Sequence, residues 1–449
     1  MNDVLEHEQL LEQNGDSSDD AEDGIALRRV HPRRAQAKAL LEHDSDSGSP
    51  TRNGLAWTAE DERRVVRKLD RLVMPLLIIA FFALQLDRGN IGNALTDFFL
   101  EDVDITQSQF NNGQELLALG IVLWEIPSNF VLYRIGPSVW ISAQIVAWGL
   151  VATFQAFQHG SGAFMTTRFL LGSCESGFIP AALFTISRFY KRDETSKRFA
   201  WFFIGNHFAQ ATSGLIAYLE GLFTISIGAL FITLFPKGVN NPTSLTGIRY
   251  FTANESRTLS ARVLLDDPSK QNKGENITMA ELRSTFTNWK LLPHILAAVL
   301  GLAPGATFGA YGPTLVESFG YGRLISNAMM SIGLWLGLLL TLLWGHMADR
   351  YGRRGPVALA GIFGLWLFLF ISRLLIYSDV GLARFLALTF AVAFSGVWHP
   401  VNGSWMALNA PTLGERSITM AILIMSANSG EISLSISMTE TFSNYTQQI

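Results

Sequence analysis

Long apolar runs occupy most of this chain after residue 57, and they constrain its fold more than any other feature. A helix needs about 20 mostly apolar residues to cross the hydrocarbon core of a bilayer. We expect membrane-spanning helices near 72–92, 113–133, 138–158, 163–187, 199–218, 220–235, 291–312, 325–346, 356–377, 383–408 and 417–436. The sequence therefore predicts an all-α polytopic membrane protein with about eleven spans.

The composition agrees with a membrane protein and excludes other classes. Hydrophobic residues make up 49% of the chain and charged residues only 16%, a balance that suits contact with lipid. Lys and Arg number 34 against 38 for Asp and Glu, so no basic excess indicates nucleic-acid binding. The single cysteine, Cys174, lies in an apolar run and is expected to pack rather than react. The sequence shows no metal-ligand cluster, nucleophile arrangement or phosphate-binding loop, so we expect neither a cofactor nor an enzyme.

The polar segments indicate the organisation and the orientation of the chain. Residues 1–57 are acidic and Ser-rich, lack a signal-peptide pattern, and are predicted to be a disordered cytoplasmic segment. Basic residues cluster before the first apolar run and in alternate loops, which places the N-terminus in the cytoplasm. The chain is then expected to divide into a first transmembrane half at 58–235, a cytoplasmic linker at 236–290 and a second, incomplete half at 291–449.

One loop carries a motif. Gly345-His346-Met347-Ala348-Asp349-Arg350-Tyr351-Gly352-Arg353-Arg354 lies between two apolar runs, and a weaker copy that keeps Arg134 and Gly136 at the same offsets lies in the first half. By itself such a loop could be an ordinary turn. The longer stretch resembles the cytoplasmic loop signature of the major facilitator superfamily, in which Gly permits a tight helix exit, Asp caps the next helix and basic residues hold the loop inside. The resemblance implies a transporter with two similar halves. Its conformational gating loop would comprise Gly345, Asp349, Arg350, Gly352, Arg353, Arg354 and Arg134.

Charged side chains within the apolar runs indicate where function lies, because each costs about 2.5–3.5 kcal/mol on insertion scales. Asp87, Arg88 and Asn90 interrupt the first run, whereas Arg168 and Glu175 lie two helical turns apart on one face of the fourth. Arg168, Arg88 and Asn90 are predicted to bind an anionic substrate, and Glu175 and Asp87 to take up a coupling proton. Alternatively, Asp87 or Glu175 only neutralises an Arg in a structural pair.

Other candidates for substrate binding are polar residues beside helix breakers. They are Asn206, His207 and Gln210 in the fifth expected helix, His399, Asn402 and Trp405 in the tenth, and Glu125 and Tyr311. The breakers are Gly172, Gly177 and Pro180 in the fourth helix, Pro304, Gly305, Gly309, Gly312 and Pro313 in the seventh, and Gly396, Pro400 and Gly403 in the tenth. Discontinuous helices at equivalent positions of two halves point to a site near the midplane. Interhelical hydrogen bonds and close packing are the competing explanations.

Several of these stretches resemble one branch of the superfamily. Leu86–Ala94, Glu125–Asn129, Arg168–Gly172 and Tyr190–Glu194 are similar to the fungal allantoate permease-like anion:cation symporters, and the similarity extends from about Trp57 to the end of the chain. It implies proton-coupled uptake of a small organic anion, a carboxylate such as a vitamin or an allantoate-type nitrogen source. The expected partners are this anion, a proton and the lipid bilayer. A monomer in the plasma membrane is expected, with no nucleic-acid partner.

Two features depart from the twelve spans of that family. The run from Phe199 to Phe235 would measure about 55 Å as one helix, far longer than a bilayer core of about 30 Å, so a break is expected near Glu220 and Gly221. The segment 437–449 is polar and too short for a twelfth span. An alternative function is therefore a transport-inactive membrane nutrient sensor or a degenerate transporter copy.

Overall fold

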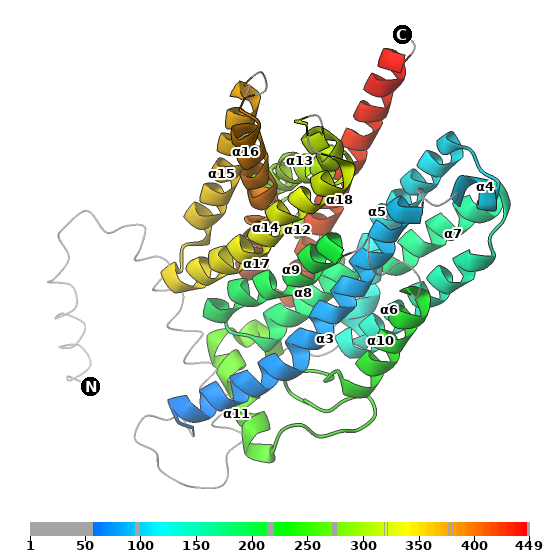
Figure 1. Cartoon of the computed structure of the whole chain (residues 1–449). Coiled ribbons are helices and arrows are strands. Elements are labelled where there is room, and N and C mark those ends of the chain that lie inside the picture. The colour runs from blue at the N-terminus through cyan, green and yellow to red at the C-terminus, as the bar shows by residue number, and fades with distance from the viewer. Residues whose placement is uncertain are drawn as a thin grey trace, which may run out of the picture.

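Figure 1 shows a computed structural model of the chain, which describes residues 57–94, 99–212, 220–271, 276–317, 319–320, 322–375, 378 and 380–446. Helices make up nearly all of these residues. Extended pairing among them is limited to two isolated β-bridges between residues 236 and 249. The predicted all-α fold is confirmed. The predicted disordered segment 1–57 lies outside the described residues except for Trp57.

The helices before residue 236 follow the expected spans closely. They are α3 (Ala59–Ala94), the short α4 (Phe99–Val103), α5 (Gln107–Ile135), α6 (Pro137–Phe154), α7 (Gly160–Glu175), α8 (Phe178–Phe189), α9 (Thr195–Thr212) and α10 (Glu220–Leu234). Capping residues explain several starts. The Thr106 hydroxyl oxygen accepts a hydrogen bond from the backbone N–H of Gln109 at 3.2 Å, and the Thr106 backbone N–H donates to the Gln109 side-chain oxygen at 2.9 Å, a capping box that begins α5.

The helices after residue 236 complete the bundle. They are α11 (Ala253–Asp266), α12 (Met279–Phe286), α13 (Leu292–Glu317), α14 (Arg323–Tyr351), α15 (Arg354–Leu374), α16 (Gly381–Phe394), α17 (His399–Asn409) and α18 (Leu413–Thr446). By length and hydropathy, seven helices or joined helices in the described part of the chain could cross a membrane. An eighth is added if α12 and α13, bent by 54°, count as one span, and α10 is a shorter apolar helix.

One expectation about the helices needs correction. Pro304, Gly305 and Gly309 were expected to loosen the seventh span, but α13 runs through them as one helix. Membrane helices tolerate Pro and Gly because neighbouring groups satisfy the freed backbone. The segment 437–449, expected to be too short for a twelfth span, continues α18 as far as Thr446.

The long apolar run of residues 199–235 folds into two helices that run in opposite directions. Arg198 at the start of α9 binds Asp70 of α3, and Phe208 further along α9 contacts Phe82. Phe82 also contacts Phe223 near the start of α10. The chain after α10 then returns to the level where α9 began, because Phe235 contacts Phe189, the end of α8. The expected break near Glu220 and Gly221 is therefore confirmed, since α9 ends at Thr212 and α10 begins at Glu220.

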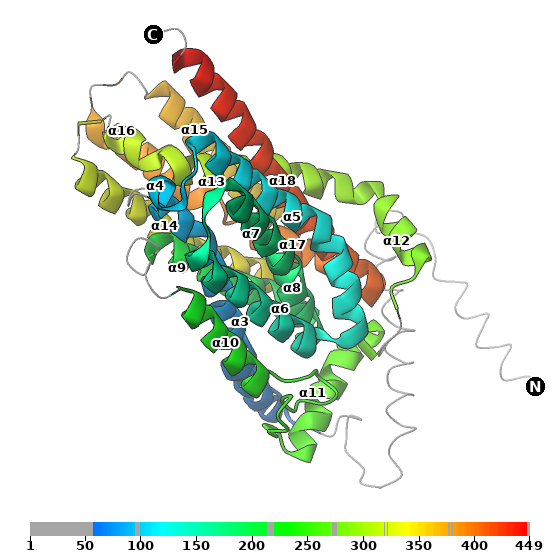
Figure 2. The same ribbon diagram turned by 90° about the vertical axis from the view of Figure 1, so that its right-hand side faces the viewer.

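The helices pack as two groups that meet along their length. Helices α3–α10 form one group and α13–α18 the other, and α5 with α18 and α9 with α14 are the main pairs between them. Figures 1 and 2 show the start of α3 and the helix α11 at one end of the bundle, and the C-terminal end of α18 at the other. We call the first of these the linker end.

The segment 236–290 binds both groups of helices at the linker end. The guanidinium of Arg262 in α11 is buried and binds Glu62 at the start of α3, at 3.0 Å, and Glu194 just before α9. Asp267, after α11, instead binds Arg416 in the first turn of α18 at 2.7 Å. Glu281 of α12 accepts a hydrogen bond from Thr412, just before α18, at 2.6 Å. The segment is therefore docked on the bundle rather than extended in solvent.

Candidate functional site

The break between α7 and α8 is held by buried polar contacts. Gly177 adopts a positive φ of 77°, which suits glycine, and a Cβ there would lie 2.1 Å from the Ser128 hydroxyl oxygen. Its backbone N–H donates to the Glu125 carboxylate at 3.1 Å, and the Gln144 side chain donates to the Ser176 carbonyl. Backbone groups freed where a helix ends need such partners in a membrane. Glu125, one of the predicted lining residues, therefore supports this break.

An ion pair lies beside the break. The Arg88 Nε of α3 donates to the Glu175 carboxylate of α7 at 2.8 Å. The Glu175 side chain is fully buried, whereas 21% of the Arg88 side chain is exposed. The Arg side of the pair is therefore the part that a small molecule could reach. The contact agrees with the alternative in which Glu175 neutralises an Arg, and its partner is Arg88 of α3.

Arg168 lies two turns before Glu175 on α7, is buried, and interacts electrostatically with it. Its guanidinium lies over the Phe164 ring at 5.3 Å from the ring centre, a cation–π contact. Asp87 is buried beside Arg88. The side chain of Asn90 lies outside the described residues. The structure thus brings Arg88, Arg168 and Glu175 together from two helices.

The polar residues of α9 face both groups of helices. The Asn206 side-chain oxygen accepts hydrogen bonds from Gln85 of α3 and from Gln210, the latter at 3.0 Å. His207 is hydrogen-bonded through Nε2 to Thr341 of α14 at 3.1 Å, which joins the two groups. A Cβ at Gly396 would lie 3.7 Å from the His207 ring, so this ring lies beside the break between α16 and α17.

The three candidates on α17 separate into two places. His399, in the first turn, is buried and makes an edge contact with Phe203 of α9 at 5.2 Å between ring centres. Asn402 instead binds His294 at the start of α13, and Trp405 packs against the same His294 ring at 4.6 Å. His399 therefore lies with the α9 residues, whereas Asn402 and Trp405 belong to the contact of α17 with α13. The side chain of Tyr311 lies outside the described residues.

These contacts form a polar series across the two groups. His399 of the second group contacts α9, and Gly396 of the second group lies beside His207 of α9. Asn206 of α9 binds Gln85 of α3, and Arg88 follows Gln85 by one helical turn. The Arg88–Glu175 pair completes it. Among the described residues, no group of three or more His, Cys, Asp or Glu could hold a metal ion.

The predicted gating loop contacts the first group at the linker end. The Asp349 carboxylate accepts hydrogen bonds from the backbone N–H groups of Ser196 and Lys197, the start of α9, at 3.0 and 2.7 Å. Arg354 donates to the Ser196 hydroxyl at 2.8 Å and to Asp349 at 3.3 Å. Gly345 permits the close approach of α14 and α9, because a Cβ there would lie 2.4 Å from the Ala200 Cβ.

The other loop residues have different surroundings. Gly352 ends α14 with a φ of 65°, and Gly136 ends α5 with a φ of 88°, so the two copies of the motif share a glycine-dependent helix end. Arg350, Arg353 and Arg134 are exposed. Of the predicted basic gating residues, Arg354 therefore binds between the groups, and the exposed three do not.

Comparison with known families agrees with this two-group bundle. The sequence model of the Major Facilitator Superfamily matches residues 77–432, well over half of the 449 residues. The chain belongs to the major facilitator superfamily. It is a transporter by family and not an enzyme.

Relatives of this facilitator in sequence include fungal transporters. The "Uncharacterized transporter YIL166C" of Saccharomyces cerevisiae is 27% identical over 84% of this chain and 74% of its own length. The "MFS-type transporter efuF" of Hormonema carpetanum is 25% identical over 82% of this chain and 76% of its own length.

Solved structures with the same fold include two sugar transporters. The proton:xylose symporter XylE, bound to 6-bromo-6-deoxy-D-glucose, aligns with a TM-score of 0.58 and 14% identity over 86% of this chain and 90% of its own. FucP in the outward conformation aligns with a TM-score of 0.54 and 13% identity over 82% of this chain and 91% of its own. At this identity, the likeness shows the fold alone.

Several residues of this facilitator's candidate site were missed by the sequence analysis. Gln85, Gln144 and Thr341 are polar residues in apolar helices that bind the predicted residues or the α7 break. Gln85 lies one turn before Arg88, so the spacing of polar residues along one helix face was an available signal. His294 gave no comparable signal, because it lies just inside its helix and its partner Asn402 is far away in sequence.

Proposed function

We propose that this facilitator is a proton-coupled symporter for a small organic anion, of the allantoate permease-like branch. The observation that carries the proposal is the ion pair of Arg88 with the buried Glu175, with the buried Arg168 two turns from Glu175. Buried intramembrane charges are expensive and mark substrate and proton pathways in transporters. Two Arg side chains can bind a carboxylate with the bidentate geometry that a guanidinium provides.

Glu175 and the substrate would compete for the same cation. While Glu175 is ionised, its carboxylate occupies Arg88. A proton on Glu175 removes that charge, so the Arg88 guanidinium becomes available to a substrate carboxylate. Binding of the anion thereby favours uptake of the proton, and release of the proton favours release of the anion. Such competition for one site couples the two ligands thermodynamically.

The proposal includes an orientation and a division of the chain. The residues of the linker end are rich in Lys and Arg, which favours a cytoplasmic position for this end and for the N-terminus. We assign 58–235 and 291–449 to the two transmembrane halves, 236–290 to the cytoplasmic linker, and a monomer in the plasma membrane to the working unit. XylE is a proton:xylose symporter and FucP a fucose:proton symporter, which is compatible with proton coupling in this fold.

Uptake measurements with Arg168 variants test this function. Cells that lack their own permeases would express the protein and receive a panel of radiolabelled organic anions at acidic and neutral pH. Arg168→Ala should lower uptake of the accepted anion by at least about 30-fold, because truncation of one partner of a buried charge pair costs about 2–5 kcal/mol. Arg168→Lys should restore little, because a point charge lacks the planar fork.

The matched control is Arg373→Ala, which removes an exposed cation from α15. It should leave uptake unchanged at equal surface expression. Normal uptake by Arg168→Ala would remove this residue from the binding site. Binding of an anion by the parental protein without its accumulation in cells would instead identify a sensor and refute transport.

A further inference from the structure

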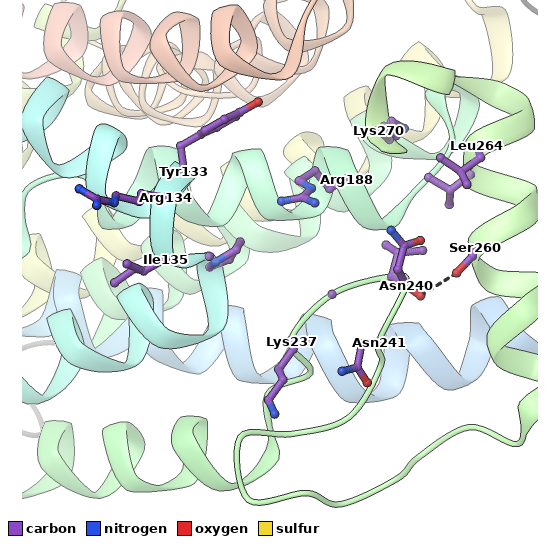
Figure 3. A pocket seen from close by; sticks show the side chains of 15 residues that line it. Tyr133, Arg134, Ile135, Arg188, Lys237, Asn240, Asn241, Ser260, Leu264 and Lys270 are labelled. Carbon is purple, nitrogen blue, oxygen red and sulfur yellow. Dashed lines mark hydrogen bonds between the residues drawn. The ribbon is translucent and has the colours of Figure 1, made fainter. Parts of the chain in front are cut away.

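A cavity lies at the linker end, apart from the polar series. It has a volume of about 220 Å³ and is lined by the end of α5 and the start of α6, by the end of α8, by the loop after α10, and by α11 with the turn that follows it. Figure 3 shows side chains from all of these segments around one space. No part of the proposed transport mechanism uses this cavity.

The charges of the lining residues are all positive. Arg134, Arg188, Lys237 and Lys270 come from four different segments, and no Asp or Glu is among the lining residues. Asn240 and Ser260 add neutral polar groups. Four cations around one small cavity, without a lining carboxylate, repel one another and favour an anion among them.

Two of the cations are deep and two are at the rim. Lys270 is 4% exposed, and Arg188 is half-buried with its guanidinium 5.6 Å from the Phe184 ring centre. Arg134 and Lys237 are exposed. Positive charge is therefore present both on the buried side of the cavity, at Lys270 and Arg188, and on its exposed side, at Arg134 and Lys237.

The acidic residues nearest to Lys270 are already engaged. Asp266, 3.9 Å from the ammonium, accepts a hydrogen bond from the Arg192 N–H at 2.9 Å, and Asp267 binds Arg416 at 2.7 Å. The Lys270 ammonium itself donates to the Tyr190 carbonyl at 2.7 Å. Burial, together with the nearby positive charge of Arg416, lowers the pKa of Lys270 to about 8. A neighbouring anion would relieve this repulsion.

We propose that this cavity binds the phosphate group of an anionic ligand, either a phospholipid headgroup or a soluble phosphate ester. Phosphate oxygens accept charge-assisted hydrogen bonds from Arg and Lys, and Arg188 offers a planar donor group in the lining of the cavity. The volume suits a compact headgroup better than a drug-sized molecule, which needs about 300–1,000 Å³.

Binding there would join the linker to the first helical group. Arg134 and Arg188 belong to α5 and α8, whereas Lys237 and Lys270 belong to the segment 236–290. An anion held between the two pairs of cations adds contacts between these parts. The ligand would thus act on the linker rather than on the transported substrate.

Two double variants with equal loss of charge test the proposal. Arg134→Gln with Lys237→Gln removes the rim cations, whereas Arg257→Gln with Arg283→Gln removes two exposed cations of α11 and α12 that do not line the cavity. Purified protein in phosphatidylcholine nanodiscs would be titrated with inositol 1,4,5-trisphosphate. Vesicles of phosphatidylcholine with and without phosphatidylinositol 4-phosphate would form a second arm with detergent-solubilised protein.

The rim variant should bind about 30-fold more weakly than the parental protein, because each Lys or Arg near an anionic surface contributes about fivefold. The control variant and Arg168→Ala should bind as the parental protein does. Preference for the vesicles with phosphatidylinositol 4-phosphate identifies a lipid headgroup, and preference for the soluble ester identifies a free phosphate compound. Equal losses in both double variants, or no binding of either probe by the parental protein, would overturn the proposal.

Discussion

Asp349 offers the sharpest test of how the linker end is held closed. Its carboxylate caps the start of α9 across the two helical groups, with hydrogen bonds of 3.0 and 2.7 Å, and it also contacts Arg354. Only 9% of its side chain is exposed. Asp349→Asn keeps the shape but removes the charge. It also presents an amide NH₂ to one of the two backbone N–H groups, so at least one hydrogen bond is lost.

The structure allows the size of the effect to be worked out. A hydrogen bond to a charged group contributes about 1.5–3 kcal/mol, and the loss of one bond together with the charge on the other gives about 3 kcal/mol. These contacts exist only while α14 and α9 lie together at the linker end. The open population should therefore rise by about 150-fold, since each 1.4 kcal/mol is a factor of ten.

Cysteine labelling can measure this population. Ser404 of α17 is fully buried and its hydroxyl lies 2.8 Å from that of Ser196 across the groups, so Ser404→Cys in a Cys174→Ser background reports opening. A small thiol reagent should label this cysteine about 100-fold faster when Asp349→Asn is added.

Two further variants define what the result means. Glu60→Gln, which neutralises an exposed carboxylate at the same end, should leave the labelling rate unchanged. Gly345→Ala should accelerate labelling as Asp349→Asn does, because its Cβ would lie 2.4 Å from that of Ala200. An unchanged rate in folded Asp349→Asn would refute the argument that this carboxylate holds the two groups together.

Three other predictions concern coupling, the helix break and the linker. Glu175→Gln should flatten the pH dependence of uptake and abolish accumulation, while exchange of external for internal substrate survives. Full accumulation with the parental pH profile would exclude Glu175 as the proton carrier. Gly177→Ala should lower the melting temperature and the yield, since the φ of this residue is positive and the new Cβ would lie 2.1 Å from the Ser128 side chain. Gly162→Ala should lower neither, because the space around Gly162 is open. Equal stability of the two variants would contradict the strain at Gly177. Burial alone would raise the pKa of Asp267, but the contact with Arg416 holds this pKa well below its ordinary 3.8. The stabilising effect of the Asp267 carboxylate is therefore present above about pH 4 and is lost as the pH falls through the lowered pKa. Asp267→Asn should cost about 3–5 kcal/mol at pH 7, and a thermal-denaturation difference that persists unchanged at pH 2 would argue against this origin.

The spans could be predicted from sequence because a bilayer imposes a simple length requirement on apolar helices. The break within residues 199–235 followed from the same requirement, since one helix of that length exceeds the membrane. The breaks themselves were harder to place. Gly177 does lie at the break between α7 and α8, but Pro304 and Gly305 leave α13 continuous, because the neighbours of a helix decide whether a freed backbone group finds a partner.

The partners of the charged residues could not be predicted from the sequence. The spacing of Arg168 and Glu175 placed them on one face of a helix, yet the direct ion pair of Glu175 is with Arg88 on α3. Likewise, Asn402 and His399 are neighbours on α17, but one binds α13 and the other contacts α9. Which helices become neighbours is a property of the folded bundle, so periodicity along one helix cannot supply it.

The docked linker has a consequence for how the protein could be produced. Ion pairs of Arg262 attach α11 to the first helical group, and five residues later an ion pair of Asp267 with Arg416 attaches the same segment to the second group. A cut within residues 272–275 would leave Arg262 and Asp267 on the first fragment and α12, Thr412 and Arg416 on the second, so the Asp267–Arg416 ion pair would join the two fragments. Two separately synthesised fragments should therefore recognise each other in the membrane and reassemble. The peptide bonds at this point would then mainly ensure that the two fragments are made in equal numbers.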